Sequence, residues 1–279
     1  MLNIALSLSD FLYLKRKGPI NFTAAKKRRM LRHLGAQRTP QHNLKLATLL
    51  GLTAGFVNAE GFLGFSVLTT NVTGHAALFA ERIAFQDWKT VVVIALWMFL
   101  FLAGAFFTSL VLSFTGENQR FSYFIPVIIE ILILLVSAFY GYKYDGTLVS
   151  KEFFAGSLLF AMGLQNALVS MVSGSVVRTT HLTGTFTDLG IDLAQILHGD
   201  KAERPKLKSK IKLRTYIIFF FMAGAVLGAY LFHRFGFPSF FAPITTLLFA
   251  LLYDMLRIRA KRYYRTGVNA IKRSIGHTE

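Results

Sequence analysis

Two short polar blocks interrupt otherwise apolar stretches of the sequence. The first is Thr69-Thr70-Asn71-Val72-Thr73-Gly74-His75, and the second is Thr179-Thr180-His181-Leu182-Thr183-Gly184-Thr185, 110 positions later. Thr and Asn are good helix N-caps, and Gly tolerates strained backbone. Each block is therefore predicted to break its helix and to start a half-helix, over His75–Ala84 and Thr185–Leu197. The free N–H groups and positive dipole end of such a half-helix would attract an anion or a polar solute.

The structural alternative is that the Thr hydroxyls only bind carbonyl oxygens of their own or neighbouring helices. We favour a functional break, because irregular backbone at membrane depth normally lines a cavity. The residues predicted to line a solute path are Asn58, Glu60, Thr70, Asn71, Thr73, His75, Asn166, Arg178, Thr180, His181, Thr183 and Asp188.

Charged side chains inside the apolar stretches are candidates for chemistry. Glu130 lies mid-run, where an unpaired carboxylate costs several kcal/mol, so it is expected to be buried and either protonated or paired. A carboxylate partner is expected for Arg178. These charges could form a structural ion pair, or they could couple protons or bind substrate. Asp188 and Asp192 share a helix face; we expect Asp192 to be solvated near the cytoplasmic end and Asp188 to lie deeper.

Asn58 and Asn166 occupy matching positions, which leaves open solute coordination, bracing of the broken helices, or ordinary interhelical hydrogen bonding. His75 and His181 could titrate near neutral pH. No metal site is expected, because no His-x-x-x-His or Glu-x-x-His spacing occurs and the chain has no cysteine. The sequence has no nucleophile motif and no Walker A loop. We therefore predict no enzyme activity and no cofactor.

The elements that must position these residues are long apolar runs. Mean hydropathy is +0.48 and 53% of residues are hydrophobic, yet the net charge is +17. This combination predicts an all-α, polytopic membrane protein embedded in a lipid bilayer. The eight predicted segments cover Leu44–Leu63, Phe65–Ala84, Thr90–Phe114, Phe121–Tyr142, Phe153–Val172, Ser175–Leu197, Thr215–Phe232 and Pro238–Leu256.

Basic residues are concentrated in three blocks. Of 31 Lys and Arg, ten lie in 1–45, seven in 201–214 and seven in 257–273. The positive-inside rule places all three blocks in the cytoplasm, so both termini are expected there, in a bacterial inner membrane. Anionic lipid headgroups are the expected partners of these blocks, and nucleic acid is not. Eight membrane crossings would put all three basic blocks on the cytoplasmic side. The same is true if segments 1–2 and 5–6 are re-entrant hairpins, or if the chain has six strong helices and two weak ones.

The two halves of the sequence resemble each other beyond the polar blocks. Residues 54–59 (AGFVNA) align with 162–167 (MGLQNA), residues 101–105 (FLAGA) align with 221–225 (FMAGA), and Pro126 has a counterpart in Pro243. We therefore predict two repeats of four segments, with segments 2 and 6 broken or re-entrant. An even number of crossings per repeat makes the repeats parallel, with a pseudo-two-fold axis along the membrane normal.

Spaced glycines are expected to let these helices approach closely. Gly51-x-x-x-Gly55 and Gly224-x-x-x-Gly228 have the small-x-x-x-small spacing of packed membrane helices. We favour packing within the monomer, and the sequence leaves a homo-oligomer open.

Two pairs of motifs resemble the YoaK-like family of bacterial multi-pass membrane proteins of unassigned function. The first pair is 54–64 (AGFVNAEGFLG) with 69–74 (TTNVTG), and the second is 160–167 (FAMGLQNA) with 179–185 (TTHLTGT). The resemblance covers roughly 43–256 and implies a membrane protein with a repeated motif, without indicating a substrate. The family more often has Asp at the position of Asn58, and often Asn at that of His75.

We divide the chain into a basic cytoplasmic arm (1–43), a membrane domain (44–256, with repeats over 44–142 and 153–256) and a basic tail (257–279). The expected function is a secondary transporter or channel for a small polar or anionic solute, with its site between the repeats. The alternative is a non-transporting membrane scaffold or lipid-binding protein.

Overall fold

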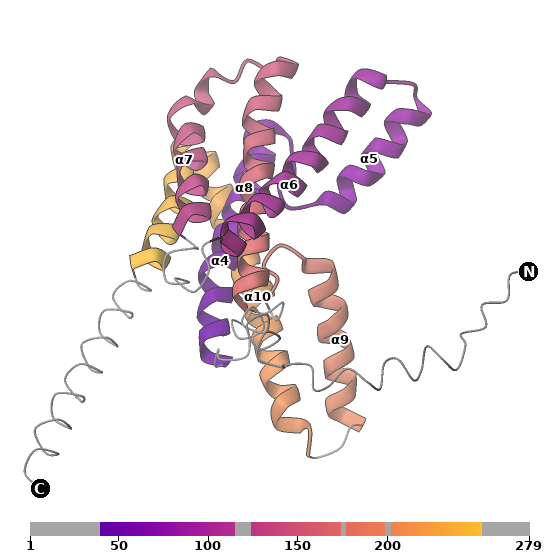
Figure 1. Cartoon of the computed structure of the whole chain (residues 1–279), viewed down its shortest axis with the longest axis vertical. Helices are drawn as coiled ribbons and strands as arrows, with labels where there is room; N and C mark the ends of the chain where they lie inside the picture. Colours follow the sequence, from indigo (N-terminus) through magenta and orange to yellow (C-terminus); the bar gives the residue numbers. More distant parts are fainter. Residues whose placement is uncertain (1–39, 115–123, 174–176, 199–201, 253–279) are drawn as a thin grey trace, which may run out of the picture.

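The computed structural model describes residues 40–114, 124–173, 177–198 and 202–252, and every regular element in these ranges is a helix. The predicted arm and tail fall almost entirely outside the described residues. Figure 1 shows how the elements are arranged. In chain order they are α4 (Pro40–Phe65), α5 (Val72–Ala84), α6 (Trp88–Phe114), α7 (Phe124–Tyr140), η2 (Gly141–Lys143), α8 (Leu148–Ser173), α9 (Leu182–His198), α10 (Arg204–Phe235), η3 (Phe237–Phe240) and a helical continuation of η3 to Leu252.

Four of the described helices are long and apolar enough to cross a membrane, namely those over Trp88–Phe114, Phe124–Lys143, Leu148–Met171 and Arg204–Phe235. The helix over Phe237–Leu252 is apolar but shorter. Many large apolar side chains on these helices are exposed, such as Phe99, Phe106 and Phe219. Exposure of this kind places hydrocarbon against hydrocarbon in a bilayer, where it carries none of its usual cost in water.

The centre of the molecule is a pair of close helix crossings. Helix α4 packs along α10, and α8 packs along α6. At the first crossing, a Cβ atom on Gly55 would collide with the backbone of α10 at Phe221, and one on Gly224 would collide with the backbone of α4 at Leu52. Only glycine at these positions lets the two backbones touch.

The second crossing repeats this arrangement. A Cβ atom on Gly104 would collide with the backbone at Phe160, and one on Gly163 with the backbone at Phe101. Gly55 aligns with Gly163 in the sequence, and Gly104 aligns with Gly224. The aligned glycines therefore occupy corresponding positions in the two crossings, and all four serve packing within one chain.

Contacts along the helices define their relative directions. Gly51 lies beside Ile217 and Gly228 beside Phe56, so α4 and α10 run parallel. In contrast, Gln165 of α8 hydrogen-bonds to the carbonyl oxygen of Leu50, whereas Leu158, earlier in α8, lies beside Gly61, later in α4. Helices α4 and α8 therefore run antiparallel, as Figure 1 also shows.

The prediction that both halves run in the same direction is contradicted by this packing, because the aligned helices α4 and α8 point in opposite directions. The physical reason is the length of segments 2 and 6. Helix α5 has 13 residues and α9 has 17, so they extend about 20 Å and about 26 Å. Both are shorter than a hydrocarbon core of about 30 Å, whereas α4 and α8, with 26 residues each, are longer. A segment that does not cross changes the number of crossings in its half from even to odd.

The predicted helix breaks are present on the described side of each polar block. The chain leaves helical conformation between Phe65 and Val72, and residues 177–181 are non-helical before α9 begins at Leu182. The half-helices begin at Val72 and Leu182, three residues before the predicted starts at His75 and Thr185, because the first Thr and Gly of each turn already adopt helical conformation.

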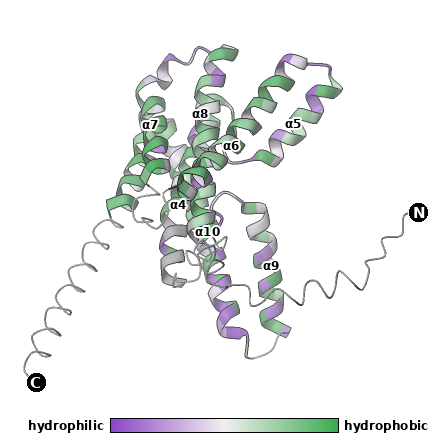
Figure 2. Cartoon of the chain, in the orientation of Figure 1, coloured by the Kyte–Doolittle hydropathy of each residue, from purple (hydrophilic) through white to green (hydrophobic). Residues whose placement is uncertain are grey.

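Basic residues gather at one end of the bundle. Because α4 and α10 are parallel, their N-terminal ends lie at the same end, and α10 begins with Lys206, Lys208, Lys210 and Lys212. Figure 2 shows the hydrophilic residues concentrated in this part of α10 and in the adjoining part of α9. The charge segregation seen in the sequence is thus retained in space.

Candidate functional site

Asn58 on α4 binds the first polar block. Its Oδ1 atom accepts hydrogen bonds from the backbone N–H of Thr70, at 3.2 Å, and from the Thr70 hydroxyl, at 2.9 Å. The neighbouring Thr69 is buried, and its hydroxyl donates to the Val57 carbonyl oxygen at 3.4 Å. The non-helical segment is therefore attached to the preceding helix, and its backbone polar groups find partners there.

Asn166 on α8 makes the corresponding contact in the second half. Its Oδ1 atom accepts a hydrogen bond from the Thr180 hydroxyl at 2.7 Å. Asn58 and Asn166 are both half-buried, as are Thr70 and Thr180. The structure thus brings together four of the predicted path residues as two matched Asn–Thr pairs, although the sequence alone left the role of the asparagines open.

The first turns of α5 and α9 are also alike. Asn71 caps α5, because its Oδ1 accepts the N–H of Gly74 at 2.9 Å. A Cβ atom on Gly74 would collide with the Asn71 side chain, and one on Gly184 would collide with the His181 ring. A Cβ atom in either Thr-Gly pair would therefore force the side chain three positions earlier to shift, and in α5 that residue is the N-cap.

The remaining path residues differ in accessibility. Thr73, Thr183 and His181 are exposed, whereas His75 is buried. The His75 Nε2–H donates to the Leu68 carbonyl oxygen at 2.9 Å, and the ring packs edge-on against Trp97. This interaction assigns His75 to the packing of α5 on α6.

The two Asn–Thr pairs lie at different depths along the bundle. Gln165, adjacent to Asn166, bonds to Leu50 of α4, eight residues before Asn58. At 1.5 Å per residue, the pairs are separated by about 12 Å along the helix axes. Figure 1 shows α5 and α9 running from this middle region toward opposite ends of the molecule, so that both N-termini are directed inward.

Glu60 and Glu130 are completely buried, and neither carboxylate has a hydrogen-bond partner. The Ser239 hydroxyl of η3 is the polar neighbour of Glu60. Glu60 follows Asn58 by two residues and therefore faces another side of α4. It does not join the Asn58–Thr70 pair.

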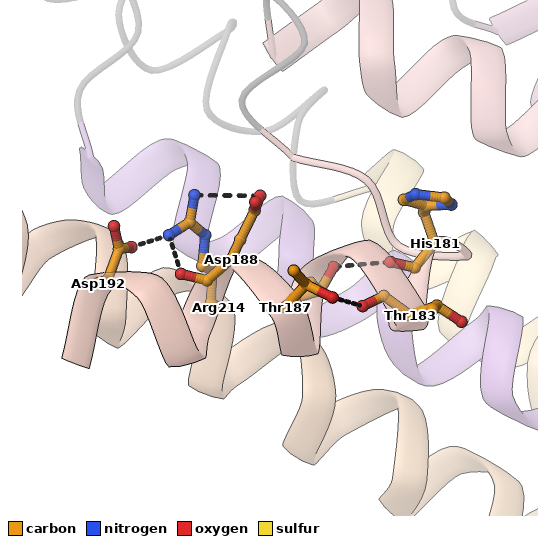
Figure 3. Close-up of polar contacts among 7 residues, drawn as sticks. His181, Thr183, Thr187, Asp188, Asp192 and Arg214 are labelled. Atoms are coloured by element: carbon orange, nitrogen blue, oxygen red, sulfur yellow. Dashed lines mark hydrogen bonds and ion pairs between the residues drawn. The ribbon is translucent and has the colours of Figure 1, made fainter. Parts of the chain in front are cut away.

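Asp188 and Asp192 are both paired, but with Arg214 rather than Arg178. Arg214 of α10 donates to the Asp188 carbonyl oxygen at 2.8 Å and pairs with its carboxylate at 3.1 Å, and it also pairs with the Asp192 carboxylate (Figure 3). Arg178 is exposed and forms no ion pair with any described residue. The prediction of a carboxylate partner for Arg178 is not met.

The Asp192 side chain is not solvated as expected, and it is less exposed than that of Asp188. The Asp192 side chain is 4% exposed, whereas that of Asp188 is 56% exposed. Helix α9 packs on α10 through the face that carries Asp192, and this contact could not be read from the sequence of α9 alone.

Several polar residues in the interior were not predicted. Gln165 is buried and bridges α8 to α4, the Thr53 and Thr246 hydroxyls lie 2.6 Å apart, and the Thr108 hydroxyl donates to the Leu164 carbonyl oxygen. Gln165 sits beside Asn166 in the aligned motif, so its polarity inside an apolar run was a usable signal. Within the described ranges, no three His, Asp or Glu side chains come together as a metal site would require.

A separate cavity of about 670 Å³ lies on the outside of the α6–α8 pair. Its walls come from the N-terminal turns of both helices, and they are apolar except for one lysine and one glutamate. The lining residues are Trp88, Lys89, Val92, Val93, Leu148, Val149 and Glu152.

Helices of membrane-spanning length, apolar exposed surfaces and a basic end define a multi-pass transmembrane protein. Residues 46–253 match a family model described as "Protein of unknown function (DUF1275)", and the chain belongs to that family. It is 24% identical over 185 residues to the UPF0700 transmembrane protein YoaK of Bacillus subtilis (strain 168), covering 66% of this chain and 81% of that protein. The resemblance to YoaK-like proteins is thereby confirmed. No solved structure matches the chain.

Proposed function

We propose that the protein carries a small polar or anionic solute across the membrane, as a secondary transporter or channel. The observation that supports this proposal is the matched pair of contacts, Asn58 with Thr70 and Asn166 with Thr180, at the starts of two half-helices. Polar groups are costly at membrane depth, and irregular backbone there normally lines a solute path.

The hydrogen-bonding state of the asparagines favours a solute that accepts hydrogen bonds. In both pairs the Oδ1 atom is occupied by a threonine donor. The Asn58 amide therefore has only its N–H donors to offer a solute, because its Oδ1 accepts two hydrogen bonds, and the Asn166 amide offers its N–H donors and one remaining lone pair of Oδ1. Half-helix N-termini add further N–H groups and a positive dipole end, so the environment suits anions or neutral solutes with carbonyl or hydroxyl oxygens.

We infer that the halves form inverted repeats, each with three crossing helices and one half-helix that enters and leaves from the same side. The antiparallel α4 and α8 and the short α5 and α9 support this inference. Inverted repeats place related sites symmetrically about the bilayer midplane. A solute would then meet one Asn–Thr pair after the other, about 12 Å apart, and not both at once.

The orientation follows from the basic end of the bundle. The four crossings through α4, α6, α7 and α8 are an even number, so the N-terminal ends of α4 and α10 lie on one side, and the positive-inside rule makes that side cytoplasmic. We assign the protein to the bacterial cytoplasmic membrane, with its basic blocks at anionic headgroups.

Osmotic swelling of proteoliposomes tests the transport function without a labelled substrate. The panel would be sodium chloride, sodium nitrate, sodium phosphate, glycerol and urea. Asn58→Asp combined with Asn166→Asp keeps side-chain size but replaces the amide donors with carboxylate oxygens, and we expect at least a tenfold slower entry of the transported anion. Thr187→Val is the matched control, because the Thr187 hydroxyl only bonds to its own helix at Thr183.

An absence of swelling with every solute would reject the transport function for this panel. Unchanged swelling in the double Asp variant, with wild-type activity present, would reject the assigned path.

A second candidate function is lipid binding without transport. The cavity beside Trp88 and Lys89 favours it, because its lining is apolar apart from Lys89 and Glu152 and suits an acyl chain, and Lys89 would pair with an anionic headgroup. Native mass spectrometry with phosphatidylglycerol would support this candidate if Lys89→Gln removed a bound lipid. Equal lipid retention in wild type and variant would count against it.

A further inference from the structure

Glu60 is a buried acid without an ionic partner. Its side chain has no exposed surface, and both carboxylate oxygens lack a hydrogen-bond partner. The ion pairs among the described residues join Arg82 to Glu81 and Asp87, and Arg214 to Asp188 and Asp192, so Glu60 takes part in none of them. A carboxylate in such surroundings is held as the neutral acid, because its ionised form is not compensated.

No charged group on the packed elements reaches Glu60. Helix α4 contacts α8, α10 and η3. On η3, the polar group that faces Glu60 is the Ser239 hydroxyl. The titratable residues nearest this depth along α8 and α10 are Lys151, Glu152, Tyr230, His233 and Arg234, and none of them forms an ion pair with Glu60.

An aromatic cluster separates Glu60 from the nearer end of the bundle. Phe65, five residues later on α4, is completely buried and packs against four rings at centroid distances of 5.0 to 6.4 Å. These rings belong to Tyr144, Phe154, Phe237 and Phe240. The cluster joins α4, α8, η3 and the segment before α8, so any movement of η3 would disturb both the cluster and the Ser239 contact.

We propose that Glu60 is the proton-binding site that couples solute movement to a proton, and that the Phe65 cluster is the barrier between this site and the end of the bundle at which α4 ends. The proposal rests on the proposed transport function. When the cluster opens, the Glu60 O–H bond breaks, the electron pair stays on the carboxylate, and the proton passes to water. In the other conformation a hydronium ion gives a proton to the carboxylate, which restores the neutral acid and leaves water.

Glu60 is better placed for coupling than Glu130. It lies two residues from Asn58, on the helix that holds the Thr70 contact, so solute binding and proton binding act on the same turn of α4. Glu130 is equally buried, but it lies on α7, which does not carry either Asn–Thr pair. Glu130→Gln is therefore the matched control for Glu60→Gln.

Infrared spectroscopy of the full chain in lipid tests the proton site without any solute. At neutral pH the wild type should show the carbonyl band of protonated carboxyl groups. Among the described residues, Glu60 and Glu130 are the buried carboxyl groups without a partner, and Glu60→Gln should remove the contribution of Glu60 from this band. An unchanged band in that variant would overturn the proton site. Glu60→Leu serves as a second variant if the amide disturbs folding, because Leu168 occupies the aligned position in the second half.

Coupling is tested with a pH dye inside proteoliposomes that face gradients of chloride, nitrate or phosphate. Wild type and Glu130→Gln should change luminal pH as the anion enters. Glu60→Gln should lose at least nine-tenths of the pH change while swelling persists.

A luminal pH change in Glu60→Gln equal to that of wild type would overturn the coupling role. Swelling without any pH change in wild type would also overturn it, while the transport function would survive. Failure of all swelling would reject transport and coupling together, and the infrared result would still decide whether Glu60 binds the proton.

Discussion

Gly55 of α4 and Phe221 of α10 meet backbone to backbone, with no space between them for a Cβ atom. One turn earlier on the same helix, Gly51 approaches Ile217 at an ordinary van der Waals distance, since a Cβ atom there would lie 3.7 Å from the Ile217 carbonyl oxygen. The α4–α10 crossing thus has one contact that requires glycine and one that tolerates a methyl group.

Gly55→Ala should therefore destabilise the protein, because the new methyl group must push two backbones apart. Overpacking of this kind costs about 1–3 kcal/mol. Gly51→Ala should not destabilise the protein, because the new methyl group has room and alanine is favoured over glycine inside a helix by about 0.5–1 kcal/mol. Thermal unfolding in detergent measures both, and equal midpoints for the two variants would contradict the assigned contact.

The two Asn–Thr pairs differ in how far their hydrogen bonding depends on the threonine hydroxyl. Thr70 also donates its backbone N–H to Asn58, whereas Thr180 is held to Asn166 by its hydroxyl. Thr180→Val should lower the free energy of local opening at residues 177–181 by more than Thr70→Val lowers it at 67–71. The expected difference is about 1 kcal/mol, the net contribution of one hydrogen bond. Hydrogen–deuterium exchange of these peptides checks this, with Thr187→Val as the control. Greater exchange in the Thr70 variant would refute the difference.

The Arg214 ion pairs should hold α9 against α10 unequally. Asp192→Asn removes the partner in the buried part of the contact and should cost about 1–3 kcal/mol. Asp188→Asn should cost less than about 1 kcal/mol, because that carboxylate is largely exposed. Exchange rates of the α9 backbone report both effects. If Asp188→Asn loosened α9 more, the importance assigned to Asp192 would be wrong.

Glu130→Leu should stabilise the protein. The variant removes a buried carboxyl group that has no hydrogen-bond partner, and Leu247 occupies the aligned position in the second half. Replacement by an apolar side chain of similar volume is expected to raise the free energy of unfolding by about 1 kcal/mol. Denaturant unfolding measures this change, and a clear loss of stability would show that Glu130 has a partner when folded.

Asp145, before α8, should titrate at unusually low pH. Hydrogen bonds from the Thr147 hydroxyl and N–H, at 2.7 and 2.9 Å, lower the pKa of the Asp145 carboxyl below its ordinary value of 3.8. A lowered folded-state pKa contributes stability above the unfolded pKa, and this is lost as pH falls through the folded one. Thr147→Val should return the pKa toward 3.8 in an NMR titration. An unchanged midpoint would assign the shift to another cause.

Segment boundaries could be predicted from the sequence because they depend on local chemistry. The polar blocks at 69–75 and 179–185 indicated interruptions, since Thr, Asn and Gly favour helix starts, and the structure places α5 and α9 there. The Gly51-x-x-x-Gly55 and Gly224-x-x-x-Gly228 spacings indicated close packing in the same way, and Gly55 and Gly224 make backbone contacts. What these patterns could not predict was whether a short helix crosses the bilayer, and so the relative direction of the halves was predicted wrongly.

Which charged and polar side chains contact one another was decided only by the tertiary structure. The residues of α9 give no sign that Asp192 is buried, because its depth depends on the face that α10 covers and on Arg214. Glu60 likewise has the Ser239 hydroxyl as its polar neighbour only through the position of η3. The sequence by itself determined the apolar helices and their interruptions, because lipid obliges each helical segment to satisfy its own backbone hydrogen bonds. Only packing decided direction, depth and pairing, because these depend on which helix lies opposite.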